Sequence, residues 1–226
     1  MDRPIILASV SPRRREIFEL LGVPFAVQPV SVDETPRPGE APDVLVARLS
    51  ATKAATVAQE ALTSSRDRGG KSAAALKPSL VVAADTVVVL DDQILGKPGD
   101  AAHAQEMLMD LRGRAHMVYT GVTVVETSSG RAAIHLSATQ VWMRDYSQAE
   151  MKAYVASGDP LDKAGAYAIQ HAGFQPVAHI EGCFAGVMGL PLGALVDGLA
   201  HFDLTLPVDV ATVCQRWTGY PCCRGV

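Results

Sequence analysis

The sequence predicts an α/β fold on the strength of three observations. Short apolar runs alternate along the chain with stretches of helical periodicity. Several of the helical stretches begin at a capping residue and end at a glycine. The chain has 226 residues, 48% of them hydrophobic, which is enough to bury a sizeable core in one domain or in two closely packed lobes.

The apolar runs predict strands, over residues 5–9, 80–90, 117–125, 133–143 and 177–188. The periodic stretches between them predict helices, over residues 12–21, 42–62, 101–112, 147–157 and 191–202. The helix near 147 has the clearest boundaries, because Ser147 and Glu150 form a capping box and Gly158 follows the helix end.

Two segments lie outside this pattern. Residues 63–78 are rich in Ser, Gly, Ala and charge, which predicts a helix end followed by a mobile loop insertion on the surface. Residues 206–226 have no clear period, so we expect this tail to be partly ordered at best. A single domain is therefore expected over residues 1–205.

Charge and hydropathy exclude some classes of protein. The formal net charge is −4 and the isoelectric point is near 5.8, which argues against a general nucleic-acid binder. No run approaches the roughly 18 apolar residues of a membrane span. The acidic Asp2 is followed by only a short apolar run, so we do not expect a secretory signal. We therefore expect a cytoplasmic protein with no membrane partner and no stable nucleic-acid partner.

The four cysteines, Cys183, Cys214, Cys222 and Cys223, lack paired C-x-x-C spacing. We interpret them as reduced thiols rather than zinc ligands, with a redox role for the tail as the alternative. The six histidines are scattered without ligand spacing, so a histidine metal centre is not expected.

The first predicted helix begins with an unusual charge. Ser11 is a good N-cap and Pro12 suits the first helical position, yet Arg13, Arg14 and Arg15 crowd the first turn. Three cations beside the positive end of the helix dipole are unfavourable unless an anion lies opposite them. The sequence thus indicates a local anion site.

Two stretches place polar residues where apolar ones are expected. Asp85 and Thr86 interrupt a strand-like run, and a buried carboxylate needs a cation, a metal or several donors. A structural role for Asp85, capping a loop or bulge, is equally compatible with this stretch. Lys53 lies on the apolar side of its helix, either because its stem snorkels past the core or because it points into a cleft.

Other polar candidates lie in loops. Glu34 belongs to a Pro-rich loop and Lys97 follows a predicted turn, and both are compatible with plain surface charge. Whether Lys97 reaches Asp85 is left open by the sequence. In the loop over residues 158–170, Lys163 and Gln170 have small, apolar neighbours. The amide of Gln170 could read a base edge or bond to backbone.

The motifs "LASVSPRRREIFELLG", "VDETP", "AADTVVVLDDQILGKP", "GDPLDKAGAYAIQ" and "GVMGLPL" occur in this order over residues 5–202. Together they resemble the Maf family of nucleoside triphosphate pyrophosphatases. The resemblance implies a mixed twisted sheet with flanking helices, in two lobes around a deep cleft, similar to inosine triphosphatase. It also implies a hydrolase that cuts a nucleoside triphosphate to the monophosphate and pyrophosphate, and it suggests a homodimer.

The resemblance gives the candidate residues roles. The triphosphate would bind Ser9, Ser11, Arg13, Arg14 and the amides at the helix start, and Lys163 would also bind the substrate. Asp85 would accept a proton from the attacking water, and Asp85 and Glu34 would hold Mg²⁺ or Mn²⁺. Lys53 and Lys97 would offset charge on the scissile phosphoryl group and the leaving pyrophosphate.

The resemblance also bears on the base. Arg13, Thr86 and Gln170 match the residues that accompany dTTP and UTP as substrates, including modified uridine nucleotides. Ala168 stands where many relatives have glycine, which bears on the fit of the base. The alternatives are a 7-methyl-GTP pyrophosphatase and a nucleotide-binding regulator of cell division and septum formation.

Overall fold

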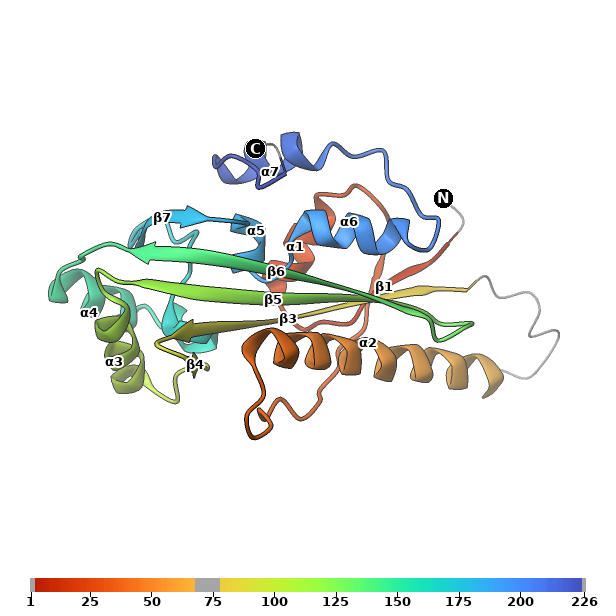
Figure 1. The fold of residues 1–226 in the computed structure, drawn as a ribbon, viewed down its shortest axis with the longest axis horizontal. Helices are drawn as coiled ribbons and strands as arrows, with labels where there is room; N and C mark the ends of the chain where they lie inside the picture. Colours follow the sequence, from red (N-terminus) through yellow and green to blue (C-terminus); the bar gives the residue numbers. More distant parts are fainter. Residues whose placement is uncertain (1–2, 68–77, 225–226) are drawn as a thin grey trace.

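The fold is built on a seven-stranded mixed sheet in the order β2-β1-β3-β5-β6-β7, with β4 also paired to β3 (Figure 1). The computed structural model describes residues 3–67 and 78–224. The β1 strand pairs in parallel with β2 and β3, and the other pairs are antiparallel. The strands are β1 (Ile5–Leu7), β2 (Ala26–Val27), β3 (Leu80–Leu90), β4 (Gln93–Leu95), β5 (Ala115–Glu126), β6 (Ala132–Met143) and β7 (Val177–Glu181).

Helices cover both faces of the sheet, so the predicted α/β class with a mixed sheet is confirmed. The long helix α2 runs along one face, while α1 and α6 lie on the other (Figure 1). The helices are α1 (Pro12–Glu19), α2 (Pro42–Asp67), α3 (Ala101–Leu111), α4 (Gln148–Ala156), α5 (Phe184–Val187), α6 (Leu192–Ala200) and α7 (Val210–Thr218). Two 3₁₀ turns, Asp159–Asp162 and Ala164–Ala166, follow α4. None of the described helices is long and apolar enough to cross a membrane.

A glycine in the middle of β5 brings α2 close to the sheet. A Cβ atom on Gly121 would lie 2.6 Å from the carbonyl oxygen of Val46 in α2. Any larger residue would therefore push the helix away from the strand. This close approach positions the side chains that α2 directs towards β3.

One edge of β3 is open for part of its length. On the side away from β5, β1 pairs with Leu80–Val82 and β4 pairs with Val88–Leu90. Within the described chain, residues 83–87 have no strand partner on that side. Because successive side chains of a strand point to opposite faces, this gap lets both faces of β3 open into the same space.

Most of the predicted elements are confirmed, including the hairpin at Asp91 and Asp92, whose φ angles are 47° and 63°. The capping box of Ser147 and Glu150 is also present. The strand predicted over 177–188 is wrong beyond Glu181. Gly182 turns the chain, and the cap at Cys183 starts the short helix α5.

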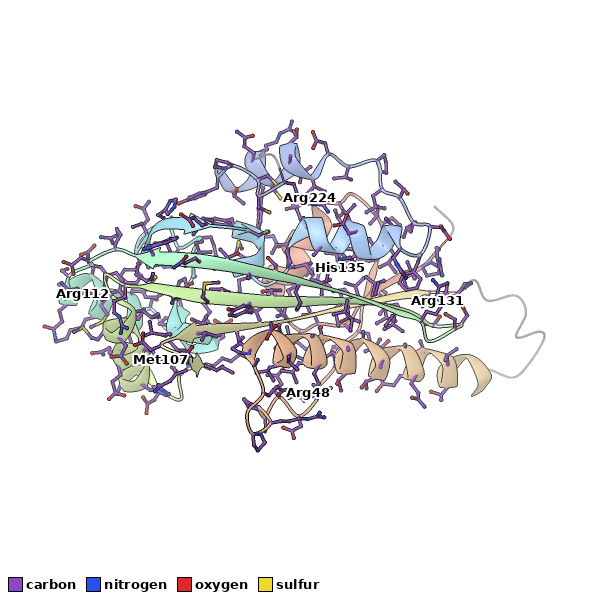
Figure 2. The ribbon with its side chains drawn as sticks, in the orientation of Figure 1. Arg48, Met107, Arg112, Arg131, His135 and Arg224 are labelled. Carbon is purple, nitrogen blue, oxygen red and sulfur yellow. The ribbon has the colours of Figure 1, made fainter. Side chains whose placement is uncertain are left out.

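The tail is more ordered than the sequence predicts. Its helix α7 has Asp209 as N-cap and buries Val210 and Cys214 in the main core. Figure 2 shows Arg224 beside α6, where it forms an ion pair with Asp197. The prediction of a partly ordered tail is therefore wrong for these residues, because the tail has an apolar surface to pack on.

Two other expectations concern the loop insertion and the cysteines. The helical part of 63–78 is confirmed as far as residue 67, and residues 68–77 of the expected loop lie outside the described residues. All four cysteines are free thiols, as predicted.

Candidate active site

A cavity of about 650 Å³ opens at the gap in the edge of β3. This volume is in the range of small-molecule sites. Its wall is lined by the segment after β1, by residues of α1, α2, β3, β4 and the two 3₁₀ turns, and by the end of α5 with the segment after it. All the candidate residues named from the sequence line it: Ser9, Ser11, Arg13, Arg14, Glu34, Lys53, Asp85, Thr86, Lys97, Lys163 and Gln170.

The charges of the lining favour an anion. The wall includes five cationic side chains, Arg13, Arg14, Lys53, Lys97 and Lys163, and three carboxylates, Glu34, Asp85 and Asp162. A cleft with an excess of one charge attracts ligands of the opposite sign. This local excess contrasts with the net charge of −4 for the whole chain.

The centre of the charged side is Lys53 of α2. Its Nζ lies 2.5 Å from Asp85 Oδ1 and 2.5 Å from Glu34 Oε1. The Lys53 and Asp85 side chains are only 9% and 10% exposed, whereas that of Glu34 is 54% exposed. The cleft interpretation of Lys53 is therefore correct, and Asp85 has the cation that its burial requires.

Only one oxygen of Asp85 is used in this contact. Lys53 binds Oδ1, and no hydrogen bond within the described chain involves Oδ2. An ionised carboxylate with a free oxygen can accept a proton from a water molecule in the cavity. The arrangement thus fixes the orientation of Asp85 and leaves one oxygen available for chemistry.

Glu34 stays ionised despite its partial burial. Burial acts to raise its pKa, but the hydrogen bond and charge of Lys53, helped by Lys97 and Arg14, outweigh this effect and hold the pKa below its usual value. Lys97 is exposed at the end of β4 and forms no hydrogen bond with Asp85 in the described structure. Its charge nevertheless acts in the same cavity.

A second ion pair holds the loop that carries Glu34. Arg48 projects from α2 (Figure 2) and its Nε donates to Glu40 Oε1 at 2.6 Å. Its Nη2 also donates to the carbonyl of Thr35 at 3.1 Å. The hydrogen bond from Arg48 lowers the pKa of Glu40 to about 2. The loop is therefore fastened beside Glu34 at any pH near neutrality.

The start of α1 forms another part of the wall. Ser9 Oγ accepts from the Ser11 amide at 3.1 Å, and Ser11 Oγ caps the helix through the Arg14 amide at 3.5 Å. Arg13 lies 3.3 Å from Asp162 Oδ2. Arg15 pairs with Glu19 on the exposed side of the helix, so the anion site has two of the three arginines.

Arg14 is held by two hydrogen bonds on the side of β3 opposite to Asp85. Its Nε donates to the Gly189 carbonyl at 2.9 Å, and its Nη2 donates to Thr86 Oγ1 at 3.3 Å. Burial lowers the pKa of Arg14, and the negative charges of Asp85 and Glu34 act against that decrease. Gly189 is needed here, because its φ is +109° and a Cβ would lie 3.2 Å from Arg14 Nε.

The loop after α4 contributes Lys163 and Gln170. The Lys163 ammonium is buried and already donates to the Asp159 carbonyl, to Asp159 Oδ1 at 3.0 Å and to Asp162 Oδ1 at 2.6 Å. Gln170 is exposed at the cavity wall. Lys163 therefore holds the loop together, while Gln170 is accessible to a ligand.

Sequence reasoning missed several residues around the cavity. Tyr167 lines it and bonds through its hydroxyl to Nε2 of the buried His116 at 2.7 Å. Burial lowers the pKa of His116 to about 4. Its Nδ1 is the one buried side-chain nitrogen or oxygen atom without a hydrogen-bond partner in the described structure. Thr120 bonds to Thr86 from the neighbouring strand. A polar residue within an apolar run was the only signal for His116 and Thr120.

The donor set limits how a metal could bind. No group of three His, Cys, Asp or Glu residues in the described chain could hold a metal ion. Asp85 and Glu34 both contact Lys53 Nζ, so their carboxylates are close neighbours. Mg²⁺ is commonly held by one or two carboxylates together with substrate phosphates and water. The two residues fit a cation that arrives with a polyphosphate rather than a preformed protein cage.

The fold and the site define an α/β protein with a cation-rich cavity that favours an anionic ligand. Residues 4–202 match the family model described as Maf-like protein. The chain therefore belongs to the Maf family, as its motifs predict.

Curated relatives cover nearly the whole chain. It is 47% identical over 210 residues to the dTTP/UTP pyrophosphatase of Nitratidesulfovibrio vulgaris, covering 91% of this chain and 92% of the relative. The corresponding enzyme of Myxococcus xanthus is 45% identical, with 90% and 94% covered. That of Pelotomaculum thermopropionicum is 40% identical, with 88% and 97% covered.

A solved structure, a nucleoside-triphosphatase / dITP/XTP pyrophosphatase from Mycobacterium abscessus, has 15% identity to this chain and a TM-score of 0.34. It covers 63% of this chain and 75% of its own.

Proposed function

We propose that this protein hydrolyses dTTP and UTP to the monophosphate and pyrophosphate, and that it acts on modified uridine nucleotides as well. The observation that carries the proposal is the geometry at Asp85, whose Oδ1 is held by Lys53 while Oδ2 is free in a cation-rich cavity. The names of relatives at 40–47% identity support the choice of substrate.

In the proposed reaction, Asp85 Oδ2 orients a water molecule against the α-phosphorus and takes its proton. The bond between the α-phosphorus and its bridging oxygen breaks, and pyrophosphate leaves. Lys53 holds Asp85 in position through Oδ1 and, with Lys97, offsets the charge of the leaving pyrophosphate. Arg13, Arg14, Ser9, Ser11 and the start of α1 hold the phosphates in place.

The proposal includes a divalent cation, Mg²⁺ or Mn²⁺, held by Glu34 and Asp85 together with phosphate oxygens. When bound, the cation would neutralise phosphate charge and polarise the scissile group. Glu34 suits this role because its pKa is held low, it lines the cavity and more than half of its side chain is exposed. We propose the nucleotide substrate as the organic ligand of the protein. We also propose that the protein forms a homodimer and that it acts in the cytoplasm.

The base is proposed to lie towards Thr86 and Gln170. Thr86 is on the face of β3 opposite to Asp85, and Gln170 is exposed on the same cavity wall. Neither is in the Lys53 cluster, and Thr86 accepts a hydrogen bond from Arg14, so the proposed position of the base is next to the phosphate-binding arginine. Arg13 lines the same cavity and pairs with Asp162.

The test is incubation of the purified protein with dTTP, UTP, CTP, dGTP or 7-methyl-GTP and Mg²⁺ or Mn²⁺, with pyrophosphate and orthophosphate measured separately. We expect pyrophosphate, and no orthophosphate, from dTTP and UTP. Pyrophosphate from 7-methyl-GTP alone would contradict the choice of base. Nucleotide binding without release of either product would contradict hydrolysis and favour a binding regulator.

A further inference from the structure

Behind the cavity wall, a buried hydroxyl on β5 controls the hydrogen bonding of Thr86. Thr120 is 1% exposed, and its Oγ1 lies 2.9 Å from Thr86 Oγ1 and 2.8 Å from the carbonyl oxygen of Gly186. Thr120 is paired directly with Thr86 in the β3–β5 register. The Thr120 hydroxyl therefore links the cavity wall to α5.

The direction of these hydrogen bonds follows from counting hydrogens. A hydroxyl has one hydrogen, and a carbonyl oxygen can only accept. Because the Gly186 carbonyl takes the hydrogen of Thr120, the hydrogen between the two hydroxyls must come from Thr86. Thr86 thus donates to Thr120, which donates to Gly186.

This direction leaves Thr86 with nothing to donate to a ligand. Its hydrogen goes to Thr120, and one of its two lone pairs accepts from Arg14 Nη2 at 3.3 Å. The other lone pair remains, and Thr86 lines the cavity. On its cavity side, Thr86 can therefore only accept a hydrogen bond.

We propose that Thr120 is a positioning residue that makes Thr86 an acceptor and thereby favours uracil and thymine over cytosine. The proposal rests on the proposed function, in which Thr86 lies beside the base. The N3 position of uracil and thymine carries a hydrogen, whereas N3 of cytosine is an acceptor. An acceptor in the pocket pairs with the former and is left facing another acceptor in the latter.

The test compares kcat/KM for UTP and CTP in three variants of the full chain. Thr120→Val keeps the shape and removes the hydroxyl, so the Thr86 hydrogen becomes free to turn towards the base. We expect the UTP-to-CTP ratio to fall by roughly 3- to 10-fold, mainly through KM, as befits one hydrogen bond. Thr120→Ser keeps the hydroxyl and should retain the wild-type ratio.

Thr123→Val is the matched control. Thr123 is on the same strand and fully buried, but its hydroxyl bonds to Ser50 on the α2 side at 2.8 Å. This variant loses a buried hydroxyl without touching Thr86 and should leave the ratio unchanged. Thermal unfolding of each variant gives the structural cost separately from the ratio.

A double-mutant cycle identifies the route of the effect. If Thr120 acts through Thr86, the change in ratio caused by Thr120→Val should disappear in a Thr86→Val background. An unchanged ratio in folded Thr120→Val, or an equal shift in Thr120→Ser, would overturn the proposal. A wild-type protein that releases no pyrophosphate from UTP would instead overturn the proposed function.

Discussion

The two faces of β3 carry different kinds of chemistry, although they open into one cavity. On the α2 face, Asp85 is held by the ammonium of Lys53 at 2.5 Å. On the opposite face, its neighbour Thr86 is held by the hydroxyl of Thr120 and by Arg14. The first face has charged groups that interact electrostatically with phosphate. The second face has mostly neutral hydrogen-bond donors and acceptors with fixed directions.

The strand β3 thus divides two tasks between consecutive residues. Side chains at 85 and 86 point to opposite faces, which would normally separate them by the thickness of the sheet. The gap between β1 and β4 at the edge of β3 removes that barrier. In our account, the charged face sets the rate of hydrolysis and the neutral face sets the choice of base.

The largest expected effect is on the charged face. Asp85→Asn should keep the fold and lower kcat by roughly 10³-fold, because the amide has the shape of the carboxylate but cannot take the proton from water. Release of pyrophosphate from UTP measures the effect, with circular dichroism as the check on folding. More than a tenth of wild-type kcat in a folded variant would contradict the role of Asp85.

Lys53→Met tests the other half of the ion pair. Methionine preserves the apolar stem, while the loss of charge should lower kcat by about 10²-fold because Asp85 loses its orientation and the leaving group loses a cation. The control is Lys152→Met, which removes an exposed lysine of α4. Steady-state kinetics with UTP should show no change in the control, and equal losses in both variants would refute a specific role.

The neutral face contributes a pH effect on stability through His116. The folded state holds its pKa at about 4, against 6.5 for an ordinary histidine. Between about pH 6.5 and pH 4, this histidine is therefore protonated in the unfolded chain and neutral in the folded chain. Acidification through this range favours unfolding.

Acidification from pH 7 to pH 4.5 should lower the free energy of unfolding of both proteins. The decrease should be about 2 kcal/mol smaller in His116→Gln than in wild type. Urea unfolding at the two pH values measures this difference. His201→Gln, at an exposed site, should behave like wild type. The same acid sensitivity in His116→Gln and wild type would show that His116 is not the group responsible.

The smallest expected effect comes from crowding the neutral face. In Gly189→Ala, the new Cβ would lie 3.2 Å from Arg14 Nε and 3.3 Å from Thr86 Oγ1. We expect KM for UTP to rise about 10-fold with little change in kcat, because binding is lost without disturbing Asp85. Gly130→Ala is the control, since it has a φ of +69° but open space around the site. A fall in kcat with unchanged KM would contradict the division between the two faces.

The sequence predicted most of the fold, because periodicity identifies long elements well. It failed at 182–188, where an apolar run does not distinguish a strand from a short helix. It also failed at α7, whose apolar stripe covers only about two turns. The caps of α7, Asp209 and Gly219, were nevertheless present in the sequence.

For the site, the sequence could show that Asp85 and Thr86 are out of place but not what they contact. Lys53 is 32 residues from Asp85 along the chain, and only the packing of α2 on β3 brings the two together. Thr120 and Thr123 look alike in the sequence, yet they face opposite sides of the sheet. The partner of Thr86 is therefore a property of strand register, which periodicity alone does not determine.

The most direct test of the division between the two faces is the UTP-to-CTP ratio of kcat/KM in Lys53→Met and in Thr86→Val. Lys53→Met should lower kcat/KM for UTP and CTP equally and keep the ratio, while Thr86→Val should change the ratio. A ratio that changes as much in Lys53→Met as in Thr86→Val would contradict the central claim.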